Sequence, residues 1–186
     1  NLKDDELFVA WFMRSYVTDT ESEAIASLVG GPKDKSLDAI YIDEAAKKVY
    51  VVQGKYHQKL DSASEKRNDV LAFSDLANVL SNVDAFKTYK KDLSQAAAGK
   101  AEEAYKRISS RGYRLQLCYV TTGKASTQLV NEANSVVRKA SCADIDIIDG
   151  KRVLRLLSDY LDGVAPPVPL LEMELESGHG VNLRGV

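Results

Sequence analysis

The sequence predicts an α/β fold with a mixed central sheet, and three observations predict it. Two short apolar segments, 37–42 and 49–56, flank the charged turn 43–48, which is typical of an antiparallel hairpin. Further along, strand-like segments at 113–120 and 144–148 alternate with helical patterns. Such alternation favours parallel strands joined by crossover helices. We therefore expect a sheet with both strand orientations, flanked by helices.

Composition limits the class of protein. The chain has 186 residues, of which 45% are hydrophobic and 28% charged, and its formal net charge is −2, so we expect a globular protein with an ordinary core. No apolar run approaches the ~20 residues that cross a bilayer, and the acidic start does not have the features of a signal peptide. We expect a cytoplasmic protein with no membrane partner. Cys118 and Cys142 lack metal-ligand spacing and are expected to be reduced thiols.

Two helices are predicted before the hairpin. Residues 4–16 begin with acids and carry apolar side chains at helical spacing, which predicts an amphipathic helix packed on the core. Thr20 and Glu23 have the spacing of a capping box, so a second helix begins there. This helix is expected to run to about Leu28 and to end at the Gly-Gly-Pro of 30–32.

The later helices are predicted from the same kinds of signal. Ser62 and Glu65 predict another capping box, which opens a helix over 62–82. The remaining helices are expected over 84–110 with a break near 96–99, over 126–140, and over 151–161 after an Asp-Gly turn. The lysines and arginines of 84–110 are interpreted as a solvated helix face.

One domain is expected over residues 1–163. From Gly163 the composition changes to VAPPVPL, a stiff, proline-rich linker. Residues 164–186 are therefore interpreted as this linker and the start of a further C-terminal region.

Polar side chains gather at one end of the predicted hairpin. Asp38 stands at the head of the first strand, and Gln53-Gly54-Lys55 closes the second. Because side chains alternate along a strand, Gln53 and Lys55 point to one side of the sheet and Gly54 to the other. If Asp38 also points to the side of Gln53 and Lys55, an acid, an amide oxygen and an ammonium converge there. Buried polar groups of this kind cost free energy unless they are paired.

These residue types suit metal-assisted hydrolysis of phosphodiesters. The Asp38 carboxylate, the Gln53 side-chain oxygen and the Gly54 main-chain carbonyl are oxygen ligands of the kind that Mg²⁺ or Mn²⁺ takes. Lys55 can stabilise charge that develops on the phosphoryl group, or position the attacking water. A helical acid upstream, Glu23, can complete the metal shell.

A candidate basic rim follows the hairpin and suits contacts with nucleic acid. It consists of Lys55 together with His57, Lys59, Lys66 and Arg67. On strand alternation His57 shares the face of Lys55 and can contact phosphate. The alternative is a rim histidine with no assigned chemistry.

Structural roles compete with functional ones at several positions. Glu21 and Glu23 are equally well explained as residues that cap a helix or favour its dipole. Packing is the preferred interpretation for three strand tyrosines, Tyr41, Tyr50 and Tyr56. Turn and strand-end roles are preferred over a second metal cluster for Asp144, Asp146 and Asp149.

The whole pattern resembles a known group of nucleases. An aspartate before one strand, followed by Gln-x-Lys on the next, resembles the PD-(D/E)xK nuclease superfamily, and the glutamine is typical of its Mrr-like restriction endonucleases. The segment GGPKDKSLDAIYIDEAAKKVYVVQGKY, residues 30–56, is similar to the N-terminal part of AIPR (abortive phage infection) proteins. Residues 121–157 resemble the Mrr-like tail, a strand and helix followed by a strand, an Ile-Asp-Gly turn and a helix.

The resemblance implies a restriction-endonuclease-like fold and a metal-dependent endonuclease that cuts DNA in phage defence or restriction. It implies that Asp38 is a metal ligand, that Gln53 replaces the usual second acid, and that Lys55 is the catalytic lysine. Glu23 would be the acid from the helix, and Mg²⁺ or Mn²⁺ the cofactor.

Two departures from the resembled nuclease pattern favour alternatives to an active nuclease. Gln53 is neutral, which removes one negative charge from the site, and the loop before Asp38 has Lys33, Asp34 and Lys35 in place of glycines and an acid. The alternative is a catalytically weak or degenerate nuclease fold that binds nucleic acid or protein. A structural or regulatory module is a further alternative. RNA is not excluded as a substrate, and cutting a duplex with one site per chain leads us to expect a homodimer.

Overall fold

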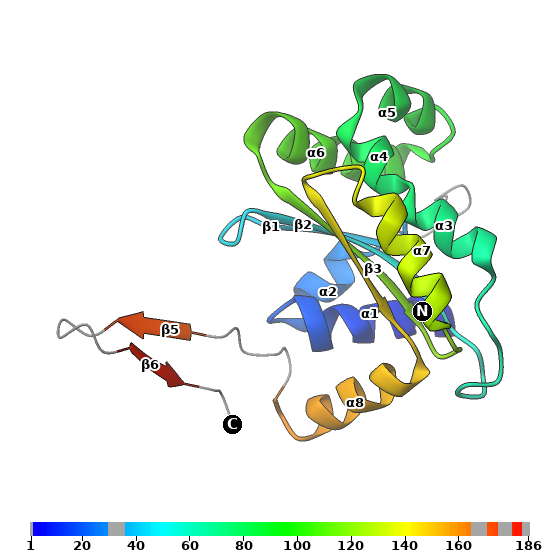
Figure 1. The fold of residues 1–186 in the computed structure, drawn as a ribbon, viewed down its shortest axis with the longest axis vertical. Coiled ribbons are helices and arrows are strands. Elements are labelled where there is room, and N and C mark those ends of the chain that lie inside the picture. Colours follow the sequence, from blue (N-terminus) through cyan, green and yellow to red (C-terminus); the bar gives the residue numbers. More distant parts are fainter. Residues whose placement is uncertain (1, 30–35, 165–170, 175–179, 184–186) are drawn as a thin grey trace.

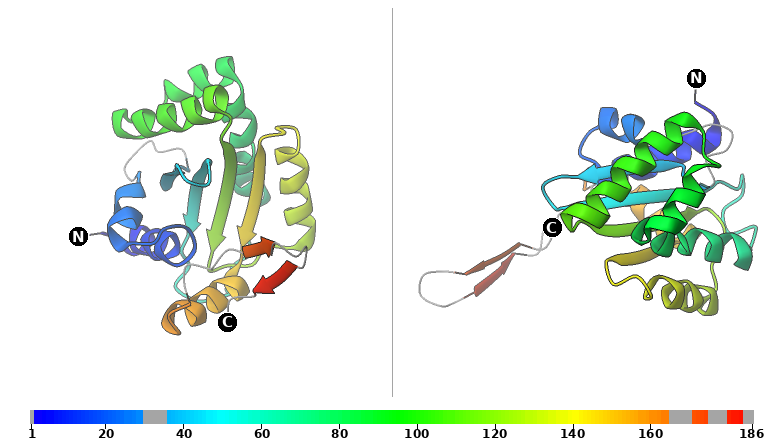
Figure 2. Two further views of the ribbon diagram at one scale, coloured as in Figure 1. Left: turned by 90° about the vertical axis from the view of Figure 1, so that its left-hand side faces the viewer. Right: turned by 90° about the horizontal axis from the view of Figure 1, so that it is seen from above.

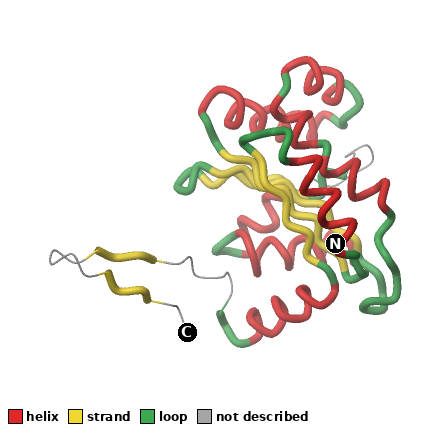
Figure 3. Tube along the Cα trace, viewed as in Figure 1, coloured by secondary structure: helices red, strands yellow, loops and turns green. Residues whose placement is uncertain are grey.

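The computed structural model describes residues 2–29, 36–164, 171–174 and 180–183. Its centre is a four-stranded sheet in the order β1-β2-β3-β4 (Figures 1 and 3). The strands are β1 (Ala39–Asp43), β2 (Lys48–Lys55), β3 (Arg114–Thr121) and β4 (Ala143–Ile148). β1 is antiparallel to β2, whereas β2, β3 and β4 are mutually parallel. The predicted α/β fold with a mixed sheet is therefore confirmed.

Helices cover both faces of this sheet (Figures 1 and 2). Those of the larger apolar core are α3 (Arg67–Ser74), α4 (Leu76–Ser81), α5 (Val83–Lys90), α6 (Gln95–Arg111) and α7 (Thr127–Val137). Those of the smaller core are α1 (Asp4–Phe12), the π-helix η1 (Met13–Val17), α2 (Glu21–Ser27) and α8 (Gly150–Leu161). None of the helices in the described ranges has the length and hydrophobicity needed to span a bilayer.

β2 lies inside the sheet because its side chains are apolar on both faces until its last residues. Val49 and Val51 belong to the larger core, whereas Val52 belongs to the smaller one, and all three are fully buried. The connection from β2 to β3 runs through α3–α6, and that from β3 to β4 through α7. The predicted parallel crossovers are thus confirmed, and β2 and β3 end side by side, with Lys55 opposite Thr121.

The predicted capping box at Ser62 and Glu65 is wrong. Ser64 instead forms a bridge with Lys124, and Glu65 donates its backbone N–H to the Lys124 carbonyl at 2.9 Å. These long-range contacts hold the segment in a non-helical conformation, so α3 begins only at Arg67. Tertiary pairing overrides a local signal here.

The predicted helix break at 96–99 is also misplaced. Those residues form the first turn and a half of α6, which Ser94 caps by accepting a hydrogen bond from the Ala97 N–H at 3.3 Å. The break between α5 and α6 lies at 91–94 instead. The capping serine determines where the helix begins, because three alanines beside a single glycine remain compatible with a helix.

The two predicted N-terminal helices are present. The capping box of Thr20 and Glu23 is confirmed, with α2 ending one residue before Leu28; the Gly-Gly-Pro expected to stop it lies outside the described residues. The first helix continues through η1, and the apolar Leu7 points outward, with 52% of its surface exposed.

The C-terminal segment contains strands that the sequence did not predict. β5 (Leu171–Glu174) pairs with β6 (Gly180–Leu183) in an antiparallel register. The expected domain boundary near residue 163 falls just after α8, and the further C-terminal region stays a prediction.

Candidate functional site

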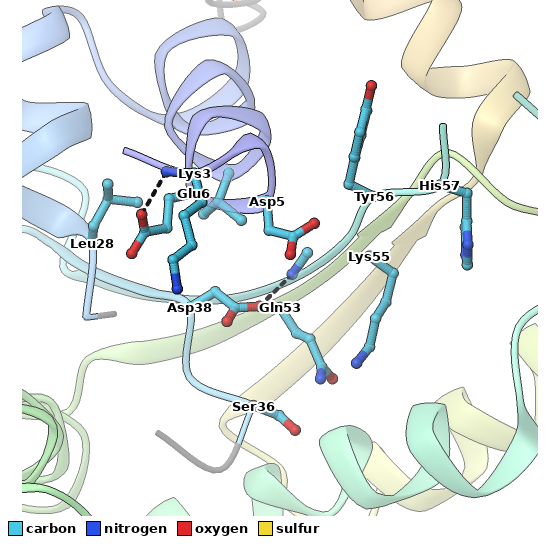
Figure 4. Close-up of a pocket in the computed structure, with 12 residues that line it drawn as sticks. Lys3, Asp5, Glu6, Leu28, Ser36, Asp38, Gln53, Lys55, Tyr56 and His57 are labelled. Atoms are coloured by element: carbon cyan, nitrogen blue, oxygen red, sulfur yellow. Dashed lines mark hydrogen bonds between the residues drawn. The ribbon is translucent and has the colours of Figure 1, made fainter. Parts of the chain in front are cut away.

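A cavity of about 410 Å³ opens where β1 begins and β2 ends. Figure 4 shows the side chains around it. The hairpin and the residues on either side of it contribute Ser36, Asp38, Gln53, Gly54, Lys55, Tyr56 and His57. Helix α1 contributes Asp5, Glu6 and Val9, and the residues that flank α1 and α2 contribute Lys3 and Leu28. The structure therefore brings Asp38, Gln53 and Lys55 to one cavity.

Strand register explains why Asp38 lies beside Gln53. Ala39 pairs with Val52, which places the preceding Asp38 opposite Gln53. The Asp38 N–H donates to the Val52 carbonyl at 2.9 Å, and its carboxylate accepts from the Gly54 N–H at 2.7 Å. The carboxylate is thus held at the end of β2 by a backbone hydrogen bond, as Figure 4 shows.

The side-chain oxygen of Gln53 is an unsatisfied buried acceptor. Only 3% of the residue surface is exposed, and Oε1 has no hydrogen-bond partner among the described residues. Leaving a buried polar atom unpaired costs roughly 1–3 kcal/mol. Gln53 lines the same cavity as Asp38, so a cation bound there is one partner that could satisfy this oxygen.

The carbonyl of Gly54 faces the same region. The Lys55 carbonyl accepts from the Thr122 N–H at 3.1 Å on the β3 side of the strand. Because successive carbonyls of a strand point in opposite directions, the Gly54 carbonyl is directed toward β1, where Asp38 receives the Gly54 N–H. A carboxylate, a side-chain amide and a main-chain carbonyl therefore provide an oxygen donor set that fits a hard divalent cation.

α1 lies directly on the glycine of this motif. A Cβ at Gly54 would come within 2.4 Å of the Val9 side chain, so only glycine permits this approach. The contact brings the first turn of α1, with Asp5 and Glu6, to the rim of the cavity. Glu6 is already engaged, because its carboxylate accepts the Lys3 N–H at 2.8 Å.

Sequence reasoning missed these helix acids. The acids of 4–6 carried only the signal of a favourable helix dipole. Nothing in their spacing shows that α1 packs over Gly54, because that contact joins segments that are far apart in the chain.

Glu23, the helix acid expected from the sequence, is not brought to Asp38. Its carboxylate accepts from the Thr20 hydroxyl at 2.8 Å and from the Thr20 N–H at 3.1 Å. It lines a separate depression together with Tyr41 and Lys100. Glu23 therefore caps α2, and the helix acids that line the cavity with Asp38 come from α1.

The expected basic rim is only partly assembled. His57 and Lys55 line the cavity, whereas Arg67 forms an ion pair with Glu132 at 2.5 Å and borders another depression. Lys59 and Lys66 are exposed and do not line the cavity. Of the five residues of the predicted basic rim, Lys55 and His57 are the two that line the cavity.

Glu65 is a second group that sequence reasoning missed. Its side chain is only 4% exposed and accepts hydrogen bonds from the hydroxyls of Thr121 at 2.6 Å and Tyr119 at 2.7 Å, and it faces His57 Nε2 at 2.9 Å. Burial works to raise the pKa of this carboxyl, but the hydrogen bonds from its three partners outweigh burial and lower the pKa. Glu65 is therefore ionised at neutral pH.

The other polar clusters have structural roles. Asp149 caps α8, Asp144 pairs with Arg114 at 2.7 Å, and Asp146 holds Arg152 and the Tyr16 hydroxyl. These contacts agree with the scaffold roles expected for the three aspartates.

The basic residues of α5 and α6 are also largely engaged. Lys100 donates to the carbonyls of Ala26 and Leu28 at 2.6 Å each, which satisfies the end of α2. Lys90 pairs with Glu102 at 2.5 Å. These contacts favour a structural role for the two lysines over a role in polyanion binding.

Comparisons with known proteins leave the resemblance to nucleases without support. No family model matches the chain, and neither a curated protein nor a solved structure is significantly similar to it. The function therefore has to be proposed from the cavity and from the pattern of residues that line it.

Proposed function

We propose that this protein is a metal-dependent DNA endonuclease of phage defence or restriction that hydrolyses phosphodiester bonds. The observation that carries the proposal is the buried, unpartnered Oε1 of Gln53, in the wall of the cavity that Asp38 and Lys55 also line. The resemblance of the Asp38 and Gln53-Gly54-Lys55 pattern to Mrr-like nucleases and AIPR proteins supports the same function.

Mg²⁺ or Mn²⁺ is the cofactor that this donor set fits. Asp38, Gln53 and the Gly54 carbonyl would hold the ion, and Asp5 of α1 takes the role first expected of Glu23. A bound ion of this kind polarises a phosphoryl oxygen and lowers the pKa of water.

The residues of the chain itself bind and orient the substrate. Lys55 presents an ammonium to the phosphoryl group as its negative charge grows, which stabilises the transition state more than the ground state. Asp38 is held by the Gly54 N–H, so its carboxylate is already placed before substrate arrives. Cutting both strands of a duplex would require two copies, and a homodimer stays part of the proposal.

A plasmid assay tests the proposal. The wild-type protein should convert supercoiled DNA to nicked or linear forms with Mg²⁺ or Mn²⁺, and Lys55→Ala should lower the rate by roughly 10²-fold or more, the usual loss on removing one charge-stabilising group. Lys87→Ala, at an exposed lysine of α5 outside the cavity, is the matched control and should cut at the wild-type rate. Undiminished cleavage by Lys55→Ala would show that Lys55 is not the catalytic lysine and would contradict the proposed site.

One observation favours the alternative, a nuclease-like fold that binds nucleic acid or a protein without cutting. Among the described residues, no three His, Cys, Asp or Glu side chains lie together as a metal-binding group. Titration calorimetry separates the two functions. DNA binding that is equally strong with and without Mg²⁺ or Mn²⁺, together with no uptake of either ion at millimolar concentration, would support the binding module.

A further inference from the structure

Helix α8 carries apolar side chains on two sides. Val153 and Leu156 are buried where the helix packs on η1, β3 and β4. Leu154, Leu157 and Leu161 are exposed instead, and Leu161 keeps 74% of its surface open to solvent. Figure 1 shows α8 at the lower edge of the molecule. The core therefore explains only one of the two apolar sides of this helix.

The three exposed leucines form one stripe along α8, the leucine stripe. They are three and four residues apart, which is the spacing of the apolar side chains that helices use to pair with one another. Eleven large apolar side chains are exposed in the described part of the chain, and five of them lie on α8 or within three residues of its end: Leu154, Leu157, Tyr160, Leu161 and Val164. A concentration of this kind marks a contact surface, whereas scattered apolar residues need no explanation.

A line of charged side chains borders the leucine stripe. Lys151, Arg155 and Asp162 are separated by four and seven residues, so at about 3.6 residues per turn they lie along one flank of the helix. The two cations stand in the first half of α8 and the acid just past its end. All three are exposed, and none forms an ion pair within the described residues. The flank is therefore positive at one end and negative at the other.

An antiparallel pair of such helices satisfies both the stripe and its flank. A two-fold axis perpendicular to the helices brings the same flank of both copies together. When Leu154 of one copy faces Leu161 of a second copy, the adjacent Asp162 of the second copy lies level with residue 153. The acid thus falls between Lys151 and Arg155 of the first copy, and the axis repeats the contact at the other end. The surface is complementary to itself.

We propose that α8 is the surface through which two copies of this chain associate, with the helices antiparallel and the leucine stripes in contact. The surface is inferred from α8 alone and does not rest on the proposed function, which leads us to expect two copies but identifies no interface. Charge complementarity favours a second copy as the occupant of the stripe, because one helix supplies both the cations and the acid that the pairing needs. Three leucines per copy form a small interface, so we expect a dimer that dissociates at micromolar concentrations.

Sedimentation equilibrium of the whole chain, from about 1 to 200 μM, tests the association. The mass of the wild type should rise from that of one chain toward that of two across this range. Leu161→Glu would place a charge in each leucine stripe and should raise the dissociation constant by about tenfold or more. Val83→Glu replaces an exposed apolar side chain of α5, so it is the matched control and should associate as the wild type does.

An exchange of charges tests whether the occupant is a second copy. Asp162→Lys and the double variant Lys151→Glu/Arg155→Glu each put like charges across the antiparallel contact, so each alone should associate more weakly than the wild type. Mixed together, the two variants should recover the wild-type mass, because opposite charges then face each other at both ends of the pair. The substitutions add acids in the first half of α8 and a cation at its end, which suits the helix dipole. Circular dichroism should therefore show an unchanged helix content.

Three results overturn the inference. A wild type that stays a single chain throughout the concentration range means that the leucine stripe does not bind a second copy. Dimers that Leu161→Glu and Asp162→Lys leave unchanged use another surface. Charge variants that stay apart when mixed contradict the antiparallel arrangement. None of these results depends on cleavage, so the plasmid assay judges the proposed nuclease separately.

Discussion

Asp5 and Glu23 are both helix acids, but only Asp5 lines the cavity. If the proposed ion binds there, Asp5→Asn should weaken Mg²⁺ or Mn²⁺ uptake by roughly tenfold, because one nearby negative charge is lost. Glu23→Gln should leave both metal uptake and stability nearly unchanged, because glutamine also serves at this position of a capping box. Titration calorimetry and urea unfolding of both variants measure these effects. Equal metal binding by wild type and Asp5→Asn would exclude Asp5 from the shell.

Glu65 also makes stability depend on pH. Its pKa is lowered in the folded state, so its contribution to stability is fully present above the unfolded pKa of about 4.3 and is lost as the pH falls through the folded value. Glu65→Gln cannot titrate, so its destabilisation relative to wild type should be largest at pH 7 and should shrink below about pH 4. Urea unfolding at a series of pH values measures the difference. A constant difference across that range would contradict the expectation.

At the scale of elements, the packing of α1 on β2 depends on Gly54, which has no side chain. Gly54→Ala would place a methyl 2.4 Å from the Val9 side chain, so α1 must move away from the strand. We expect a loss of about 1–3 kcal/mol in the free energy of unfolding, together with a lower rate in the plasmid assay of the proposed nuclease. Gly99→Ala is the matched control, because a Cβ there meets nothing within 4 Å and a helix interior favours alanine by about 0.5–1 kcal/mol. Chemical denaturation of both variants measures their stability. A loss in Gly54→Ala but not in Gly99→Ala would show that the contact with Val9, and not the replacement of a glycine as such, causes the loss.

The order of elements could be predicted from the sequence because each carries its own local signal. The apolar hairpin at β1–β2, the cap of α2 and the Asp-Gly turn before α8 all lie where their residues indicate. The failure at the start of α3 has a long-range cause. At Ser62 and Glu65 the local signal indicates a helix, yet a pairing with Lys124, some sixty residues away in the chain, holds the backbone in another conformation.

The candidate site was predictable only in the part that comes from consecutive residues. Alternation placed Gln53 and Lys55 on one face, and antiparallel pairing placed Asp38 opposite Gln53. The roles of Asp5 and Glu65 could not be predicted in this way. Asp5 reaches the cavity through a helix that packs on Gly54, and Glu65 is held by side chains at the end of β3.

At the scale of the whole molecule, the contacts of the candidate site join residues at very different separations along the chain. These separations affect the order in which the contacts form during folding. The Asp38–Gly54 hydrogen bond lies within one hairpin, with a separation of 54 − 38 = 16 residues. By contrast, Lys55 meets Thr121 across 121 − 55 = 66 residues, a parallel pairing that requires a long loop to close first. We expect the Asp38 carboxylate and the Gly54 N–H to meet early in folding. The contact between Glu65 and His57 should form only in the last step. Pulse-labelled hydrogen exchange should protect the Gly54 amide before that of Thr122, and the reverse order would contradict this sequence of events. Under the proposed nuclease function, a newly made chain would gain its full cutting centre only once it is completely folded, which would delay damage to DNA until the protein has reached its native state.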